Sequence, residues 1–287
     1  MMKRGINILF CLVTMGVTGM AQTLHTPFPA SFVNTRDNEL QQPAALHSVF
    51  QRLREGKEVR VMQIGDSHTR GNVYPRTVGE TLQRRFPTLS FSHYGINGAW
   101  ARRFYEQDMI QRVAAERPHL VIISFGTNEA HGDFGETTHT ATLDLLTERI
   151  AARLPGVVFL LTTPPGSYIS VRTGNRHTTG RGRRRRTRYA TAKVRNERTE
   201  RVARNIANYG TAHQIAVWDI FTIAGGPTHA CSNWQGAGLK QADGEHFLVQ
   251  GYQLQGTLLA EAIIRAYETV APKGSQTRMM QPPTPQE

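Results

Sequence analysis

The feature that most constrains the fold is a continuous apolar run from Leu120 to Phe125, which stops at Gly126. A strand with one face in water alternates apolar and polar residues, whereas a strand covered on both faces is apolar throughout. A second run of this kind spans residues 157–161. The two runs therefore predict a sheet that is buried between two layers of other structure.

Strands and helices are predicted to alternate along the chain. Three further short strands are expected at residues 59–64, 91–94 and 215–220. Helical spacing of apolar residues predicts helices over residues 46–56, 73–86, 102–116, 143–154, 194–213 and 251–269. Such alternation requires right-handed crossovers and a parallel sheet. We therefore expect one α/β domain over residues 45–271, a three-layer αβα sandwich with five parallel strands.

Several weak catalytic signals follow the predicted strands. Ser67 lies in Gly65-Asp66-Ser67-His68, on a turn where its hydroxyl and nearby N–H groups can reach the edge of the sheet. Asn128 follows the most buried strand, where its amide can donate to an oxyanion. In isolation, both segments are more often helix caps or turns than parts of a catalytic site. Ligands bind outside the carboxyl ends of parallel strands, so these loops are expected to share one rim.

Two further segments complete the pattern. Asp243 precedes His246 by three residues, a spacing at which the carboxylate can orient the imidazole as a general base, although a solvated loop is the simpler interpretation. Gly98 can present a bare backbone N–H to the same place, with an ordinary turn as its alternative. Gly95, three residues earlier, is the other glycine that could fill this role.

Together these four segments resemble the blocks of the SGNH, or GDSL-type, hydrolase family over about residues 59–267. The resemblance implies a flavodoxin-like sheet of order 2-1-3-4-5. It also implies that Ser67 is the nucleophile, His246 the general base and Asp243 its orienting partner. The N–H groups of Ser67 and Gly98 and the amide of Asn128 would form the oxyanion hole.

The resemblance extends to a branch of the family. His68 stands where the commonest family signature has leucine, and the sequence is similar to exported bacterial members that include peptidoglycan O-acetylesterases. Those proteins often carry a carbohydrate-binding insert, which this chain lacks between Ser67 and Gly98. We expect His68, Glu129 and His131 to contact substrate. No metal and no cofactor are expected, because the eleven histidines form no ligand pattern.

Net charge is +12, and most of the excess lies between Arg172 and Arg204. Residues 171–201 are poor in apolar side chains, which predicts a mobile insertion. Its densest run consists of Arg181, Arg183, Arg184, Arg185, Arg186 and Arg188. The insertion is either a solvated loop or an electrostatic clamp for an anionic polymer. Nucleic acid is not expected as a partner, because Tyr189 is the only aromatic residue in the insertion.

Residues 1–21 have the basic start, apolar core and small-residue end of a signal peptide. We expect export to the periplasm or beyond and no stable membrane span, with an uncleaved anchor as the alternative. Cleavage would leave Cys231 as the only cysteine, which excludes an intramolecular disulfide. Residues 22–44 are predicted to be a polar lead-in, and the Pro-rich residues 272–287 a disordered tail.

Three functions are compatible with this sequence. The first is an exported serine esterase that removes small acyl groups, most plausibly O-acetyl, from peptidoglycan or another carbohydrate. The second is a lipid acylhydrolase or thioesterase of the same family. The third is a non-catalytic glycan-binding protein on the same scaffold.

Overall fold

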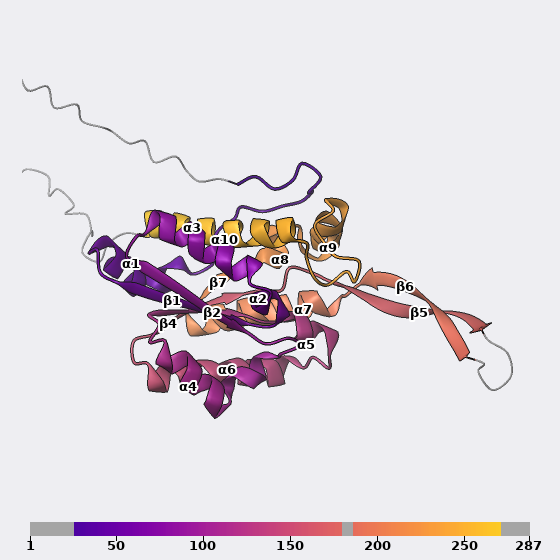
Figure 1. Ribbon diagram of the computed structural model, residues 1–287, viewed down its shortest axis with the longest axis horizontal. Helices are drawn as coiled ribbons and strands as arrows, with labels where there is room; N and C mark the ends of the chain where they lie inside the picture. The colour runs from indigo at the N-terminus through magenta and orange to yellow at the C-terminus, as the bar shows by residue number, and fades with distance from the viewer. Residues whose placement is uncertain (1–25, 180–185, 271–287) are drawn as a thin grey trace, which may run out of the picture.

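The computed structural model describes residues 26–179 and 186–270, and its centre is a five-stranded parallel sheet (Figure 1). The strands are β1 (Val59–Gly65), β2 (Leu89–Gly95), β3 (Leu120–Ser124), β4 (Val158–Thr162) and β7 (Ala216–Trp218). They are arranged in the order β2-β1-β3-β4-β7. Counting only these strands, the order is 2-1-3-4-5, which confirms the expected α/β sandwich and its topology.

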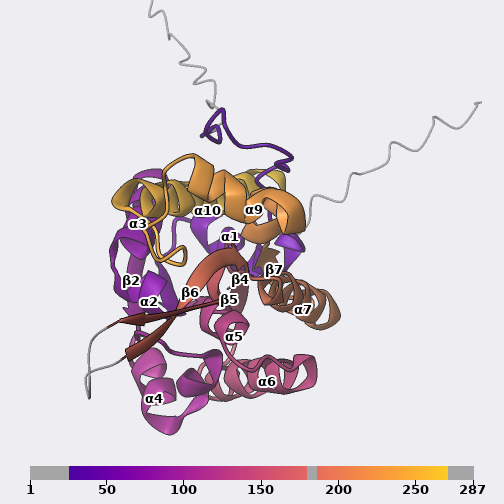
Figure 2. The ribbon, with the colours of Figure 1, turned by 90° about the vertical axis from the view of Figure 1, so that its right-hand side faces the viewer.

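Helices cover both faces of the sheet (Figure 2). One layer contains α1 (His47–Arg54), α3 (Val73–Arg85), α8 (Ile220–Ile223), α9 (Gly226–Gly236) and α10 (Val249–Thr269), and the other contains α4 (Gln107–Ala115), α6 (Glu136–Arg153) and α7 (Arg198–His213). Further short helices of the described residues connect these elements: η1 (Pro43–Leu46), α2 (Ser67–Arg70), η2 (Ala101–Tyr105) and α5 (Thr127–His131).

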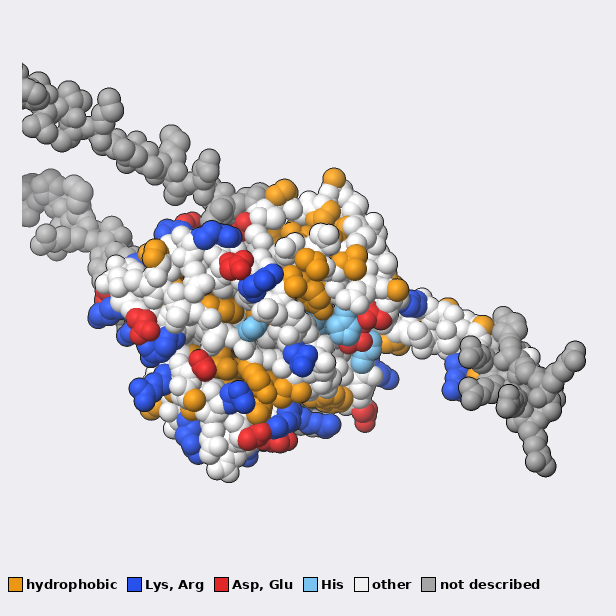
Figure 3. All heavy atoms as spheres, in the orientation of Figure 1, with side chains coloured by type: hydrophobic (Ala, Val, Ile, Leu, Met, Phe, Trp, Pro, Cys, Tyr) orange, Lys and Arg blue, Asp and Glu red, His pale blue; other side chains and the backbone are white. Residues whose placement is uncertain are grey.

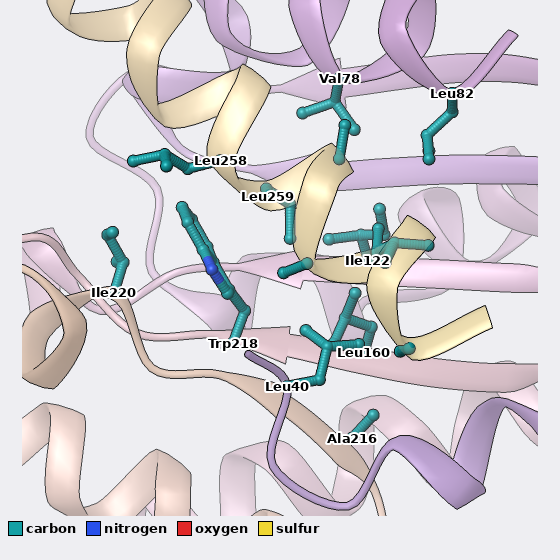
Figure 4. Packing of buried hydrophobic residues seen from close by; sticks show 14 of the residues in the cluster. Leu40, Val78, Leu82, Ile122, Leu160, Ala216, Trp218, Ile220, Leu258 and Leu259 are labelled. Carbon is teal, nitrogen blue, oxygen red and sulfur yellow. The ribbon is translucent and has the colours of Figure 1, made fainter. Parts of the chain in front are cut away.

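The strand residues divide between two cores because successive side chains point to opposite faces of a sheet. Ile122 and Leu160 face the α10 layer, where Trp218 packs beside Leu258 and Leu259 (Figure 4). Their sequence neighbours on β3 and β4 face the α6 layer. Burial of each large apolar side chain contributes about 1.5–3 kcal/mol. The apolar runs in the sequence are therefore explained by two packed layers.

The segment before the domain is more than a polar lead-in, so the predicted boundary at residue 45 is corrected. Gln41 forms an antiparallel bridge with Val217 at the edge of the sheet. Asn38 is buried, accepts a hydrogen bond from Trp218 Nε1 at 2.9 Å and donates to the carbonyl of Leu258 at 2.7 Å. Phe32 packs edge-on against Trp234. The bridge at Gln41 pairs backbone groups of β7 at an edge that would otherwise leave them exposed.

The Arg-rich insertion is a β-hairpin instead of the predicted irregular loop. Its strands, β5 (Tyr168–Thr179) and β6 (Arg186–Arg195), pair antiparallel with one irregularity between Arg172 and Arg176. The predicted start of the following helix at residue 194 is also wrong, since α7 begins at Arg198 after the second strand. Of the arginines singled out above, Arg181, Arg183, Arg184 and Arg185 lie outside the described residues.

Helix α9 is a further element that the sequence pattern does not predict. No helix within the described ranges, 26–179 and 186–270, is both long and apolar enough to cross a lipid bilayer. The predicted signal peptide and the predicted tail lie outside those ranges.

Candidate active site

Ser67 is the first residue of α2, directly after the carboxyl end of β1. Asp66 caps this short helix, because its Oδ1 accepts the backbone N–H of His68 at 2.9 Å. The capping interpretation of the Gly-Asp-Ser segment therefore applies to Asp66. The hydroxyl of Ser67 lies instead 3.0 Å from His246 Nε2, although the two residues are 179 positions apart in the sequence.

His246 is held on its other side by Asp243. His246 Nδ1 lies 2.8 Å from Asp243 Oδ2, and Asp243 Oδ1 accepts the backbone N–H groups of Glu245 and His246 at 2.8 and 2.9 Å. With the Nδ1 proton directed to the carboxylate, Nε2 is free to accept the proton of Ser67. The three side chains therefore form a continuous hydrogen-bonded line from carboxylate to hydroxyl.

The environment of Asp243 favours its charged form. Partial burial acts to raise its pKa, but the hydrogen bonds from Glu245 and His246 outweigh burial and hold the pKa below its ordinary value. A carboxylate that is ionised at neutral pH can stabilise a positive charge on the neighbouring imidazole.

Asn128 lies on α5, which follows β3, and its amide points to the same site. Its Nδ2 donates to Asp66 Oδ2 at 3.2 Å and to the carbonyl of Ala99 at 3.1 Å. Both distances are longer than the usual 2.9–3.0 Å for such bonds. A charged acceptor forms shorter and stronger hydrogen bonds, so an incoming oxyanion would compete well for this donor.

These residues line an open cavity of about 630 Å³, within the range typical of small-molecule sites. Its walls include Ser67, Gly98, Asn128, Glu245, His246 and Tyr252. The cavity is therefore bounded by the hydroxyl, the imidazole and a set of N–H groups, as an acyl-transfer site requires.

A comparison with protein-family models shows which family the chain belongs to. The model of the GDSL-like Lipase/Acylhydrolase family matches residues 63–254, about two thirds of the chain, including Ser67, Asn128 and His246. The chain belongs to the GDSL-like lipase/acylhydrolase family. Hydrolase activity of the esterase or acylhydrolase type is therefore established at the level of the family.

Solved structures of other proteins show the same fold. One, entitled a peptidoglycan O-acetylesterase in action, is 15% identical with a TM-score of 0.63 and covers 83% of this chain and 100% of its own. Another, described as a lipolytic protein of the G-D-S-L family from Desulfitobacterium hafniense, is 20% identical with a TM-score of 0.52 and covers 71% and 99%. No curated protein sequence matches this chain.

Gly98 and Gly95 occupy different environments in this GDSL-family protein. Gly98 has φ +68°, lines the cavity and has open space where a Cβ would lie. Gly95 ends β2 and packs against the turn after β1, where a Cβ would lie 2.3 Å from Arg70 N and 2.6 Å from Asp66 O. The location of Gly98 favours it over Gly95 as the oxyanion donor.

We expect Gly95→Ala to lower the free energy of unfolding by about 3 kcal/mol, because the new methyl group would overlap backbone atoms. Gly98→Ala should cost only about 1–2 kcal/mol, which reflects its left-handed backbone. Urea unfolding of the two variants tests this order. A larger loss for Gly98→Ala than for Gly95→Ala would contradict the assignment of steric roles.

Two of the residues expected to contact substrate are buried, and these predictions are corrected. His68 is 8% exposed, and its Nδ1 pairs with the Tyr252 hydroxyl at 2.9 Å behind the cavity. Burial and the neighbouring His246 lower the pKa of His68 to about 3, so its ring is neutral. Glu129 is 2% exposed, and its carboxylate accepts the N–H groups of Ala101 and Gly126.

His131 is half-buried at the edge of the site. Its Nε2 lies 2.9 Å from Ser167 Oγ, and its Nδ1 lies 3.9 Å from Glu245, which lines the cavity. His131 therefore does not line the cavity itself but adjoins Glu245, which does.

Two residues support the site in ways that sequence reasoning missed. Asp66 is buried and accepts the Asn128 amide; burial raises its pKa to about 8, assisted by the charge of Glu129. Lys240 is also buried, and its Nζ donates to the carbonyls of Gly166 at 2.8 Å and Glu245 at 3.0 Å. Burial lowers the pKa of Lys240 to about 8. The supporting roles of Asp66 and Lys240 depend on their burial, which no local sequence pattern indicates.

The loop that carries Asp243 and His246 is joined to the base of the hairpin. The N–H of Tyr168 donates to the carbonyl of Gly244 at 3.0 Å, and Lys193 Nζ bonds the carbonyl of Ala242. Beneath this junction, Cys231 Sγ donates to the carbonyl of Ser167 at 3.3 Å. Burial raises the pKa of this thiol, which makes it a poor nucleophile.

Within the part of the chain that the structure describes, no group of three or more histidine, cysteine or acidic side chains is arranged to hold a metal ion.

Proposed function

We propose that this protein is an exported serine esterase that removes small acyl groups, and O-acetyl groups first of all, from a carbohydrate substrate. The observation that carries the proposal is the hydrogen-bonded line from Asp243 through His246 to Ser67, which ends in an open cavity. This is the arrangement in which a hydroxyl is activated by a base that a third group orients.

In the proposed reaction, Ser67 Oγ attacks the ester carbonyl while its proton passes to His246 Nε2. Asp243 stabilises the imidazolium that forms. The tetrahedral oxyanion is stabilised by the N–H groups of Ser67 and Gly98 and by the Asn128 amide. His246 then gives the proton to the leaving alcohol, and a water molecule activated by the same imidazole hydrolyses the acyl-serine.

We expect Asn128→Ala to lower kcat by about 10²–10³-fold, the usual effect of losing one oxyanion donor. KM should change much less, because the donor acts mainly on charge that develops in the transition state. Steady-state hydrolysis of p-nitrophenyl acetate measures both constants. Near-normal kcat would remove Asn128 from the proposed oxyanion hole.

The acyl group and the alcohol are supported by less direct observations. The structural neighbour with a TM-score of 0.63 is described as a peptidoglycan O-acetylesterase, and it shares the fold. A lipid substrate is the second candidate, because Leu248 and Val249 line the cavity and remain 43% and 53% exposed. Such an apolar wall could also contact an acyl chain.

Hydrolysis of p-nitrophenyl esters from acetyl to octanoyl distinguishes these candidates, with the Ser67→Ala variant as the control. Serine-dependent turnover that is highest for acetate, together with acetate release from an O-acetylated glycan, supports the proposal. Preference for octanoate supports the lipid acylhydrolase. Binding of glycan without serine-dependent turnover of any ester would indicate the non-catalytic alternative.

Export is part of the same proposal. It is supported by the basic, apolar and small-residue regions of residues 1–21. Expression of the full chain followed by N-terminal sequencing of the periplasmic or secreted protein tests it. A mature protein that begins at Gln22 is the expected result, and a chain that retains Met1 in the cytoplasm would contradict export.

A further inference from the structure

The segment that contains β5 and β6 carries most of the net charge of the chain. Residues 168–195 contain ten lysines and arginines and no aspartate or glutamate, in a chain whose formal net charge is +12. Six of the ten belong to the two strands, and the other four belong to residues 180–185, outside the described residues. The rest of the chain has a net charge of only +2. A concentration of one sign on one element creates a local positive potential that attracts polyanions.

The hairpin extends away from the body of the molecule (Figures 1 and 2). It projects at the end of the sheet where α2 and α5 follow the carboxyl ends of their strands (Figure 1). On the visible face of the body, basic and acidic side chains are interspersed, and histidines gather beside acidic residues next to the base of the hairpin (Figure 3). The hairpin thus differs from the body in both shape and charge.

The base of the hairpin is bonded to a loop that lines the proposed active site. Backbone and side-chain bonds join Tyr168 and Lys193 to the loop that carries Asp243 and His246. The same loop contributes Glu245 and His246 to the cavity. A long ligand bound along the hairpin would therefore extend toward the loop that borders the cavity.

We propose that the hairpin is a docking arm for an anionic polysaccharide, which it guides to the cavity where an ester on that polymer is hydrolysed. The inference rests on the proposed esterase function and specifies its substrate class as a polymer bearing carboxylate or sulfate groups. Arginine suits these groups because its planar guanidinium binds two oxygens at once.

The hairpin is poorly equipped for single-stranded nucleic acid. Such ligands need aromatic rings on which successive bases stack. Tyr189 is the only aromatic residue between Ile169 and Arg195, and the guanidinium of Arg172 lies over its ring at 4.7 Å. Sugar rings that carry acidic groups need no such stacking platform, so the charge without aromatic residues favours a polysaccharide.

The test compares two variants that lose the same charge. The first, Arg176→Gln/Arg186→Gln/Arg188→Gln, removes three positive charges from β5 and β6, away from the junction with the active-site loop. The control, Arg76→Gln/Arg84→Gln/Arg153→Gln, removes three exposed arginines from α3 and α6. The probes are polygalacturonate, a neutral xylan, a single-stranded oligonucleotide and phosphatidylglycerol vesicles, each titrated at low and physiological salt.

We expect the wild type to bind polygalacturonate more tightly than the xylan, with affinity that falls as salt rises. The hairpin variant should bind polygalacturonate about tenfold more weakly, and the control variant should stay within about twofold of wild type. Equal weakening of both variants, or no weakening of the hairpin variant, would overturn the proposal. Tighter binding of the oligonucleotide or the vesicles than of polygalacturonate would also overturn it.

Activity measurements separate this inference from the proposed function. We expect the hairpin variant to lose turnover of acetylated polygalacturonate relative to its own turnover of p-nitrophenyl acetate, and the control variant to keep the wild-type ratio. A wild type that binds polygalacturonate through the hairpin but shows no Ser67-dependent hydrolysis would refute the esterase. A wild type that hydrolyses p-nitrophenyl acetate but binds polygalacturonate no more tightly than the neutral xylan would refute the docking arm.

Discussion

Ser67→Ala should lower kcat for p-nitrophenyl acetate by about 10⁴-fold or more, the largest effect expected from any single substitution in this chain. The variant lacks the Oγ that lies 3.0 Å from His246, so no acyl-serine can form. KM should change little, because the walls of the cavity remain. The fold should also persist, since the Ser67 hydroxyl makes no other hydrogen bond to the described residues.

Pre-steady-state kinetics make the test sharper than turnover alone. Wild-type protein should release a burst of p-nitrophenol equal to the concentration of active sites if deacylation is the slower step. Ser67→Ala should show no burst. Ser232→Ala is the matched control, because Ser232 is exposed on α9 and bonds only the carbonyl of His229. Retention of more than a tenth of wild-type kcat by Ser67→Ala would exclude Ser67 as the nucleophile.

Asp243→Asn should lower kcat by about 10⁴-fold through the tautomer of His246. The asparagine oxygen can still accept the N–H groups of Glu245 and His246, which places its NH₂ group opposite His246 Nδ1. The imidazole then carries its proton on Nε2 and cannot accept the proton of Ser67. Stopped assays of p-nitrophenyl acetate measure the loss, and thermal unfolding checks that the backbone of the loop is intact.

Asp133→Asn provides the control for this substitution. Asp133 is an exposed aspartate near α5 and lies outside the line of hydrogen bonds that ends at Ser67. We expect it to keep wild-type kcat. Equal losses in Asp133→Asn and Asp243→Asn would point to a general effect of charge instead of the orientation of His246.

The sheet could be predicted from the sequence because its signals are local. The apolar runs at β3 and β4 and the glycine that ends β1 mark buried strands, and alternation with helices restricts their order. Helix α9 was missed because its sequence begins with Gly226-Pro227 and contains mostly small and polar residues. Its place in the fold comes from the contact of Trp234 with Phe32 and Phe247, which no local pattern reveals.

The hairpin and the burial of some side chains near the site required the structure for a similar reason. The hairpin strands contain arginine, threonine and glycine where a strand packed on a core would have alternating apolar residues, so composition indicated a loop. His68 and Glu129 adjoin the motifs that carry Ser67 and Asn128, and proximity in sequence suggested substrate contact. Helices α2 and α5 turn these two side chains toward the interior.

The buried thiol of Cys231 is a probe of local opening at the junction between the hairpin and the active-site loop. Its Sγ is bonded to the carbonyl of Ser167, one residue before β5, and the side chain is only 3% exposed. A labelling reagent can reach it only when this region opens locally. The rate of thiol labelling under native conditions therefore reports how often this region opens. A polymer that holds the hairpin in place would lower the labelling rate without contacting the sulfur.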